Sequence, residues 1–392
     1  MEKLLIEILD RLMTANTDEF IPTFRSLWTH QLAQFSLKDS SRALQMSNIL
    51  LDYSKEAINA VPYKNVTRAV RIMYTYSGIA KCLALWLQGT ESGEHLREEM
   101  LKEIMELLDM IIIMTGVPVL QPQIFEWVDL LLSLFPNYEP RCIVMEALGR
   151  VSLPKISFPV AERQMSISAF SLNLAKERPN PVMMRGGIHH WPALRKWNQA
   201  DYLLHHIGRR LIPVEIGSSY TSSNWTQKLM NGYEFLTEFV FPEAPPVVGY
   251  CAQHNLLTQI PALRDDILIP DYCYCTENDD QEVIMNTWLG PKGTVSPLHT
   301  DPHHNMFAQV VGTKYVCLYG PEESGNLYPH GGILGNTSQV DLIHPDFKQF
   351  PRFANAQFTE CLVYPGDLLF IPKGWYHHVQ SLSASFSFSF WF

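Results

Sequence analysis

Long apolar runs are absent from this sequence of 392 residues, and their absence argues against a membrane-spanning or secreted protein. The apolar stretch DMIIIMTGVPVL is too short and too interrupted to cross a bilayer, which needs about 20 apolar residues. The N-terminal segment MEKLLIEILDRLM carries acidic residues inside its apolar run, and no small-residue cleavage site follows it. It is therefore not typical of a signal peptide. We expect no membrane partner.

Cysteine is also scarce. The seven cysteines are an odd, scattered set, which is not typical of a disulfide framework in a chain of this length. Cys273 and Cys275 are separated by one residue, whereas zinc knuckles typically have two residues between their cysteines. The sequence predicts no structural zinc site. It favours a reducing compartment, so that we expect the protein in the nucleus and cytoplasm.

Basic runs and several common enzyme motifs are missing as well. The net charge is −10, which disfavours direct nucleic-acid binding and suits a basic partner, although acidic charge also serves solubility. No lysine/arginine run indicates a nuclear import signal. The sequence also has no Gly-rich phosphate loop, no His-Glu-x-x-His and no Gly-x-Ser-x-Gly.

Residues 1–150 show the apolar periodicity of helices. Leu4, Ile8 and Leu12 recur every four residues and predict one apolar helical face. Further helices are predicted over 68–87, 101–114 and 125–135. The last of these would bury a face made of Phe125, Val128, Leu132 and Phe135. We expect a small bundle or repeat array that serves packing or partner binding.

Residues 151–392 change character and form the expected second domain. Proline-bearing extended segments follow residue 150, and strand-like stretches then dominate. The predicted strands are 182–184, 211–217, 283–288, 306–311, 314–319, 361–364, 368–371, 377–382 and 384–392. In the last of them, phenylalanines alternate with serines. The fold class is therefore α+β, with an N-terminal helical domain followed by an antiparallel β-sandwich or barrel of the jelly-roll (cupin) kind.

A candidate metal site lies in the stretch NTWLGPKGTVSPLHTDPHHNMFAQVVGTK. Side chains two apart in an extended segment point to the same face, so His299 and Asp301 can converge. Pro302 ends the strand directly after the carboxylate. With His377 from a later strand, these residues would complete the two-histidine-one-carboxylate set that holds non-haem Fe(II). Strand alternation points His378 the other way.

Further polar residues could complete a pocket beside this metal. Lys314 opens a strand after a tight turn, and on the inner face its ammonium could anchor a cosubstrate carboxylate. It could equally be a solvated turn lysine. Tyr250, Ser296 and Asn305 are additional candidates, although each could instead be a turn or surface residue.

Six ordered segments resemble the Jumonji-C family of Fe(II)/2-oxoglutarate oxygenases. They are PVMMRGGIHHWPALRKW, IPVEIGSSYT, NTWLGPKGTVSPLHTD, KYVCLYGP, PGDLLFIPKGWYHHV and FSFSFW, which together cover about 155–392. The resemblance implies a double-stranded β-helix barrel in which His299, Asp301 and His377 bind iron. It also implies a 2-oxoglutarate pocket formed by Tyr250, Trp288, Ser296, Asn305 and Lys314, with O₂ as the other cosubstrate.

The resemblance leaves the substrate open among several classes. Family members hydroxylate protein side chains, including arginine at C3, or demethylate N-methyl-lysine in histones, and a histone-tail peptidase activity is also claimed. The chain has no recognisable chromatin-reader module, which favours hydroxylation of a basic, arginine-containing protein. A silent binding module of the same fold is a further alternative. The resemblance places the substrate beside Glu215, Tyr220 and Trp225, which suit a guanidinium because it needs a carboxylate and an aromatic ring. Gln253 is a further polar candidate for this pocket. We expect a monomer, since the chain ends inside the last predicted strand.

Overall fold

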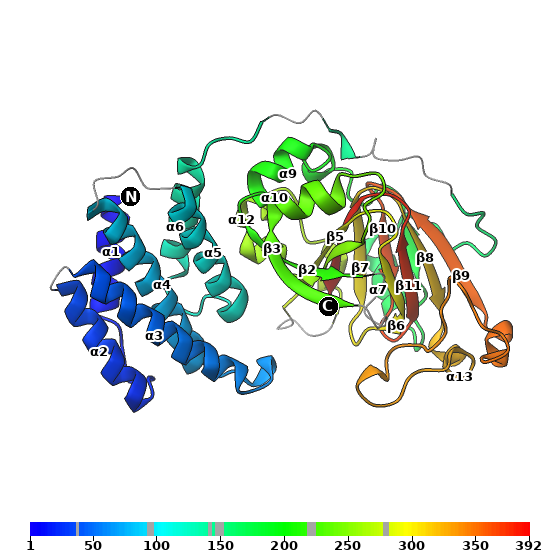
Figure 1. Cartoon of the computed structure of the whole chain (residues 1–392). Helices are drawn as coiled ribbons and strands as arrows, with labels where there is room; N and C mark the ends of the chain where they lie inside the picture. The colour runs from blue at the N-terminus through cyan, green and yellow to red at the C-terminus, as the bar shows by residue number, and fades with distance from the viewer. Residues whose placement is uncertain (37–38, 92–97, 140–142, 146–152, 218–224, 277–281) are drawn as a thin grey trace. The chain divides into compact units, whose positions relative to one another are not determined.

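The computed structural model describes residues 1–36, 39–91, 98–139, 143–145, 153–217, 225–276 and 282–392. The chain divides into two compact units (Figure 1). The helical unit comprises Met1–Asn137 with Arg209–Leu211, and the β-rich unit comprises Tyr138–Gly208 and Ile212–Phe392. Each unit has its own hydrophobic core. Among the described residues, no helix combines the length and the apolar character that crossing a bilayer requires.

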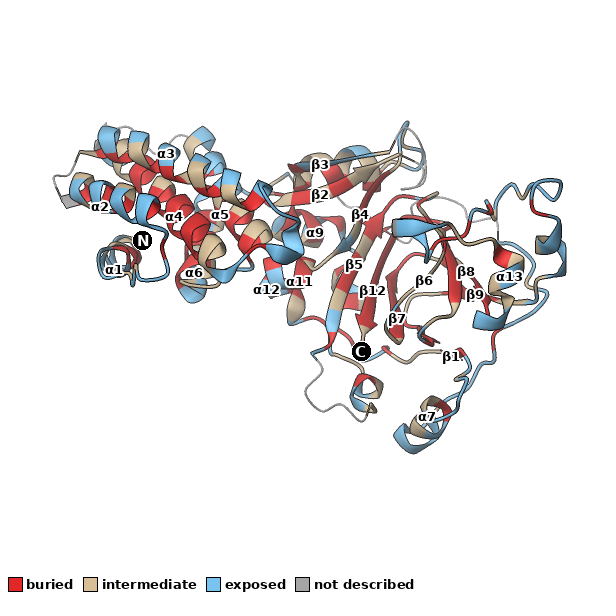
Figure 2. Cartoon of the chain, turned by 90° about the horizontal axis from the view of Figure 1, so that it is seen from below, coloured by how far each residue is buried: buried red, intermediate tan, exposed pale blue. Residues whose placement is uncertain are grey.

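The α-helices of the helical unit are α1 (Glu2–Met13), α2 (Pro22–Ser36), α3 (Ser40–Asn59), α4 (Arg68–Glu91), α5 (Glu98–Thr115) and α6 (Gln121–Leu134). In this unit, α2 to α6 pack against their sequence neighbours, whereas the first helix packs against α4 and α6. The face predicted for the first helix is correct, because Leu4, Ile8 and Leu12 are its buried residues. Helix α4 is buried along most of its length and packs against α1, α3 and α5 (Figure 2). A helix that is apolar on all sides is expected at the centre of such a unit.

The buried face of α6 differs from the predicted face. Its buried apolar residues are Ile124, Trp127, Val128 and Leu131, whereas Phe125 and Leu132 are only partly buried. The prediction is confirmed at Val128 and Phe135, which are buried, and wrong at Phe125 and Leu132. Apolar residues occupy both faces of this helix, so periodicity alone could not separate them.

The β-rich unit contains two antiparallel sheets. The larger has the order β1 (Val182–Met184), β10 (Leu368–Ile371), β7 (Asn305–Val311), β12 (Ser385–Trp391), β5 (Ile284–Gly290), β4 (Gly249–His254), β2 (Leu211–Ile216) and β3 (Thr226–Asn231). The smaller has the order β6 (Val295–Thr300), β11 (Tyr376–Ser381), β8 (Lys314–Tyr319) and β9 (Phe358–Val363). All nine predicted strands are present, most of them with shifted ends. Strands β3 and β4 were not predicted, and β6 was expected only as the extended segment around His299. The α+β class and the cupin-like architecture are confirmed.

Strand β12 shows how the sequence builds the two layers. Phe386 and Phe388 face a core covered by short helices, where both rings contact Trp197. Ser387 and Ser389 face the space between the sheets, and both are buried. A strand buried on both faces usually reads as continuously apolar. The buried serines therefore indicate that the space between the two sheets is lined by polar groups.

Short helices and one long connection complete the unit. The helices are α7 (Ile167–Leu174), α8 (Ala193–Lys196), α9 (Ala200–Ile207), α10 (Gly232–Phe235), α11 (Leu256–Gln259), α12 (Pro261–Arg264) and α13 (Ser324–Leu327). Helix α13 and the 3₁₀ turns η6 (Gly332–Leu334) and η7 (Pro351–Asn355) belong to the connection between β8 and β9. This connection packs on the outer face of the smaller sheet, where Leu327 joins Leu298 and Tyr376 in a cluster.

Candidate metal centre and active site

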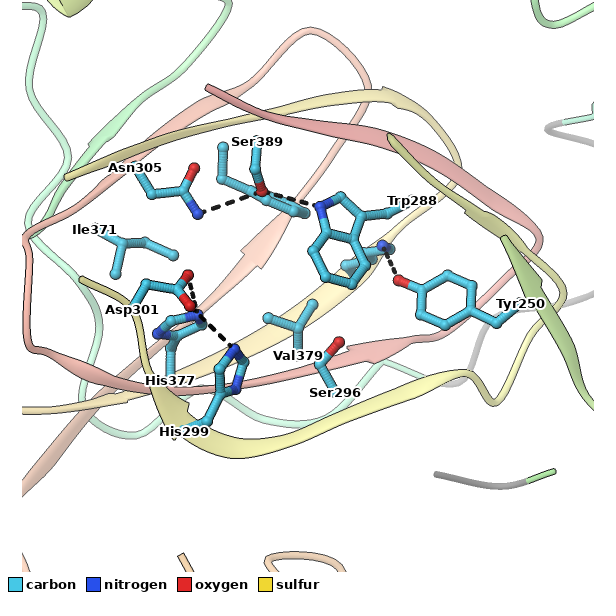
Figure 3. A pocket seen from close by; sticks show the side chains of 12 residues that line it. Tyr250, Trp288, Ser296, His299, Asp301, Asn305, Ile371, His377, Val379 and Ser389 are labelled. Carbon is cyan, nitrogen blue, oxygen red and sulfur yellow. Dashed lines mark hydrogen bonds and ion pairs between the residues drawn. The ribbon is translucent and has the colours of Figure 1, made fainter. Parts of the chain in front are cut away.

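Three predicted ligands converge between the sheets (Figure 3). His299 lies in β6, opposite His377 of β11 in the strand register, and Asp301 follows the end of β6. Asp301 Oδ1 lies 3.6 Å from His299 Nε2, and Asp301 Oδ2 lies 3.4 Å from His377 Nε2. One ligand atom of each residue can be chosen so that all lie within 4.8 Å of one another. The structure thus brings together the predicted His-Asp-His set.

Backbone carbonyls orient both imidazoles. His299 Nδ1 lies 2.7 Å from the carbonyl oxygen of Pro297, and His377 Nδ1 lies 3.1 Å from that of Trp375. A carbonyl only accepts, so each Nδ1 carries the proton and donates. Nε2 of the neutral His299 then keeps its lone pair for a metal, whereas Nε2 of His377 offers its lone pair once a metal displaces the proton that it shares with Asp301.

The electrostatics of the three residues favour a bound cation. Burial, followed by the nearby His377, lowers the pKa of His299 to about 4, so this imidazole is neutral. Burial alone would raise the pKa of Asp301 and lower that of His377. Their mutual hydrogen bond and charges outweigh it, so the pKa of Asp301 is lowered and that of His377 is raised. Among the described residues, no lysine or arginine pairs with Asp301. Two imidazoles and a carboxylate that no lysine or arginine of the described residues pairs with fit a divalent transition metal.

A buried lysine lies in the same pocket. Lys314 is 1% exposed, and its Nζ donates a hydrogen bond to the hydroxyl of Tyr250 at 3.2 Å. No carboxylate of the described part of the chain lies within ion-pair distance of this ammonium. Burial lowers the pKa of Lys314 to about 7. A buried cation without a counter-charge is costly, and an anionic ligand would remove that cost.

Polar groups around Ser389 form another wall of the pocket. Ser389 Oγ accepts hydrogen bonds from Trp288 Nε1 at 3.0 Å and from Asn305 Nδ2 at 3.3 Å. Asn305 Oδ1 is buried and has no hydrogen-bond partner among the described residues. Ser296 completes this set of lining residues (Figure 3). The five residues expected around 2-oxoglutarate therefore share one pocket with the three expected metal ligands.

A wider cleft of about 420 Å³ opens from the metal ligands toward β2 and β4. Its lining includes His299 and Asp301 at one end and Glu215 at the other. Glu215 Oε2 accepts a hydrogen bond from Trp225 Nε1 at 3.2 Å, and burial raises the pKa of the Glu215 carboxyl. A carboxylate that lines the cleft is therefore hydrogen-bonded to a neighbouring indole, although Trp225 itself is not among the lining residues.

Gln253 lines the same cleft in a strained conformation. It lies at a break in the register between β4 and β5, and its φ of 52° is in the left-handed region. That region is unfavourable for a residue with a Cβ atom.

The expectations for Tyr220 and His378 have different outcomes. Tyr220 lies outside the described residues, and His378 lines a different cleft, on the opposite face of β11 from His377.

Sequence reasoning missed several residues that shape the site. Ser389 was noticed only as part of the serine face, yet it joins two expected cosubstrate residues. Phe307 and Ile371 add apolar walls to the pocket that contains Lys314 and the metal ligands. Asn336 and Thr337 reach the cleft from the connection after β8, which carries no local pattern that indicates a site.

Comparisons with known proteins agree with this geometry. The family model described as a cupin-like domain matches residues 169–392. Lysine-specific demethylase 8 of Danio rerio is 36% identical over 377 residues, which cover 91% of this chain and 89% of that protein. Jumonji C domain-containing protein 5 of Drosophila melanogaster is 35% identical over 352 residues, covering 87% of this chain and 85% of that protein.

A third relative matches more strongly over a shorter length. Lysine-specific demethylase 8 of Xenopus tropicalis is 49% identical over 212 residues, which are 54% of this chain. That match spans 47% of the frog protein. The chain belongs to the cupin-like Jumonji-C family, as predicted. Its His-Asp-His triad is consistent with the Fe(II) site of the oxygenases in this family.

Proposed function

We propose that this protein is an Fe(II)- and 2-oxoglutarate-dependent oxygenase that hydroxylates a protein side chain, most specifically arginine at C3. The observation that carries the proposal is a pocket with two charged ends. The unpaired ammonium of Lys314 lies at one end, and the Asp301 carboxylate with its two imidazoles lies at the other. A dicarboxylate cosubstrate fits between a cation of the protein and a bound metal.

His299, Asp301 and His377 would hold the metal. The chemistry that Fe(II), 2-oxoglutarate and O₂ supply in this family is insertion of one oxygen atom into a C–H bond, with 2-oxoglutarate converted to succinate and CO₂. The chain's own residues position these groups and exclude water. Phe307, Ile371 and Val379 are the apolar members of the pocket lining, and they reduce the access of solvent.

Lys314 would bind the distal carboxylate of 2-oxoglutarate. Its three N–H donors exceed what the single hydroxyl of Tyr250 can satisfy, so donors remain for an anion. A charge-assisted hydrogen bond to a carboxylate would stabilise the protonated lysine. Ser296, Trp288 and Asn305 would complete the pocket, and the unpartnered Oδ1 of Asn305 provides an acceptor there.

The arginine side chain would enter the wider cleft. Glu215 offers a carboxylate for bidentate hydrogen bonds, and Trp225 is held against it by an indole hydrogen bond. Gln253 would contribute its amide from the opposite strand. Tyr220 stays a prediction as an aromatic neighbour of the guanidinium. A basic peptide also suits a chain with a net charge of −10.

The alternative with the most support is demethylation of N-methyl-lysine, in histones or elsewhere. It is supported by the names of the frog and zebrafish relatives, both of which are called lysine-specific demethylase 8. A hydroxyl placed on the N-methyl carbon would be lost with that carbon as formaldehyde. A histone-tail peptidase and a silent binding module are weaker alternatives. A nuclear and cytoplasmic location and a monomeric state stay predictions.

A peptide screen tests the proposal. Arginine peptides and N-methyl-lysine peptides are incubated with the full chain, Fe(II), 2-oxoglutarate and air. We expect the mass gain of one oxygen atom on arginine and an equal amount of succinate. Both should be lost in His299→Ala and kept in His190→Ala, which changes an exposed histidine away from the site. Formaldehyde from methyl-lysine peptides, with no gain on arginine, would replace the proposal with demethylation.

A further inference from the structure

A second cleft lies on the outer face of the smaller sheet. Its volume is about 540 Å³, and it lies between strands β6 and β11 on one side and residues 338–344 on the other. These residues follow η6 in the connection between β8 and β9. None of the three metal ligands lines this outer cleft. The proposed cosubstrate chemistry does not use it.

The outer cleft adjoins the cleft that holds Glu215, which we call the inner cleft. Residues 336–338 run along the edge of β6, with Thr300 N donating to Asn336 O at 2.9 Å and Ser338 N donating to Leu298 O at 2.8 Å. Asn336 lines the inner cleft, whereas Ser338 lines the outer one. Val295 lines both. The two clefts therefore share one lining residue, Val295 on β6.

His378 provides independent evidence that the outer cleft takes a ligand. Its side chain lines the cleft and the residue is only 3% exposed. Its Nδ1 atom is buried and has no hydrogen-bond partner among the described residues. A buried polar atom is rarely left unpaired in a folded protein, because water no longer satisfies it. A donor group of a molecule bound in the cleft would give this nitrogen a partner.

The lining chemistry favours a cationic side chain with an apolar stem. Asp341 is the one charged residue among the described residues of the lining. Its carboxylate is at the solvent side, where its side chain is 62% exposed and lies 3.6 Å from His344. Leu298, Val340 and Leu342 supply apolar surface below it. Lysine and arginine bind in this way, with the stem on apolar atoms and the charged end at a carboxylate.

We propose that the outer cleft binds a second basic side chain of the same substrate polypeptide whose oxidised residue occupies the inner cleft. This rests on the proposed function, because the inner cleft is taken as the site of the reaction. Val295 lies four residues before His299 on β6, which corresponds to about 13 Å along the strand. An extended peptide covers this distance with about four residues, and the crossing over β6 adds a few more. The second basic residue should therefore lie roughly four to seven positions from the oxidised one.

Binding of defined peptides to the full chain tests this inference. The probes are fluorescein-labelled Gly/Ser peptides with one arginine, with one lysine, or with both at each spacing in the range above. Anisotropy is measured with Mn(II) in place of Fe(II). For one spacing and direction, we expect the two-charge peptide to bind about tenfold more tightly than the arginine peptide, because the second contact is intramolecular.

Asp341→Asn should abolish that gain without changing the affinity for the arginine peptide. Asparagine keeps an oxygen for the Ile343 N–H, which Asp341 Oδ1 accepts at 2.8 Å, so the loop should keep its fold. Glu177→Gln is the matched control, since it also removes one exposed carboxylate but lies in neither cleft. The position of the peptide is read separately with the photo-crosslinker in Ile343→p-benzoylphenylalanine. It should label residues beside the lysine, because Ile343 is an exposed lining residue.

The outcomes separate this inference from the proposed function. If the lysine does not raise the affinity of the arginine peptide, or raises it equally in Asp341→Asn, the outer cleft does not bind the substrate. The proposed function then stands. If only lysine-containing peptides bind, and this needs Asp341, the outer site stands and arginine recognition fails. Absence of binding by every peptide would overturn both.

Discussion

Lys314 donates its hydrogen bond to the neutral hydroxyl of Tyr250, 3.2 Å away, and has no carboxylate partner in the described part of the chain. The lysine is almost fully buried, and its only aromatic neighbours within cation–π range among the described residues are Tyr250 and Phe307, at 5.5 Å and 5.4 Å from the ring centroids. These contacts compensate a buried charge only in part. The relationship explains how the pocket would select an anion, and it leads to the first two predictions.

Replacing Lys314 by methionine should separate cosubstrate binding from folding. The affinity for 2-oxoglutarate should fall at least about 30-fold, because removing one partner of a buried charge pair costs about 2–5 kcal/mol. The melting temperature without cosubstrate should stay the same or rise, because an uncompensated buried cation is lost. Thermal unfolding with and without 2-oxoglutarate measures both effects. Lys348→Met, at an exposed lysine, is the control. An unchanged cosubstrate-induced shift would contradict the assigned role.

The affinity for 2-oxoglutarate should also depend on pH. Burial lowers the pKa of Lys314 to about 7, so the free protein loses this proton as the pH rises past that value. A bound carboxylate needs the protonated lysine, so affinity should fall as the pH rises from about 7 to 9, with one proton taken up on binding. Stability without cosubstrate should rise over the same range, because the unfolded lysine keeps its proton. Calorimetry in two buffers of different ionisation enthalpy measures the proton uptake, which Lys314→Met should lack.

The sequence predicted the centre of the site well because strand geometry is local. Side chains two residues apart on one strand share a face, so His299 and Asp301 can be paired from the residue spacing alone. The same alternation separated His377 from His378, and the structure places these two in different pockets. The alternation in β12 also predicted that its phenylalanines share one face, and the structure buries that face.

Features that depend on packing between distant segments could not be predicted in the same way. Strand β4 was missed because its register breaks near Gln253, so its apolar residues do not alternate. Lys314 has no carboxylate partner among the described residues because the fold places their carboxylates beyond ion-pair distance. The spacing of residues in the sequence does not determine these distances. The outer cleft requires the connection after β8 to return to the edge of β6, through contacts that no local pattern indicates.

Metal binding should weaken as the pH falls. A metal must displace the proton that Asp301 helps His377 to keep, and the pKa of His377 is raised by that carboxylate. The apparent affinity for Co(II), measured from its absorption at each pH, should fall as the pH drops below the pKa of His377. Asp301→Asn should lower the metal affinity at least tenfold, since one of three ligands loses its charge. It should also lower the pKa of His377 in the metal-free protein, as read by NMR. His190→Ala should change neither quantity.

The left-handed backbone at Gln253 predicts a trade between stability and binding. Gln253→Gly removes the backbone strain of the left-handed conformation, which is about 1–2 kcal/mol. Glycine also gives the unfolded chain more conformational freedom, and this entropy offsets about half of the gain in stability. The free energy of unfolding should therefore stay equal or rise by up to about 1 kcal/mol in urea titrations. The KM for the peptide should rise several-fold, because the amide no longer lines the cleft. Gln253→Asn should keep the peptide KM closer to that of the parent protein, since asparagine tolerates this backbone region. A large loss of stability in Gln253→Gly would show that the side chain is structural.

The proposed function assigns Glu215 to bind the guanidinium of the substrate arginine. Burial raises the pKa of its carboxyl, so arginine binding should weaken as the pH falls through that raised value, when the acid takes up a proton. Glu215→Gln keeps the shape and can still accept from Trp225 Nε1, but it removes the charge. The KM for an arginine peptide should rise at least about 30-fold in this variant and lose its dependence on acid pH. Succinate formed without peptide should be unchanged, because Glu215 does not line the pocket that contains Lys314 and all three metal ligands. If Glu215→Gln leaves the KM for the arginine peptide unchanged and methyl-lysine peptides release formaldehyde, Glu215 does not bind the substrate arginine. That result would favour the demethylase alternative over the hydroxylase.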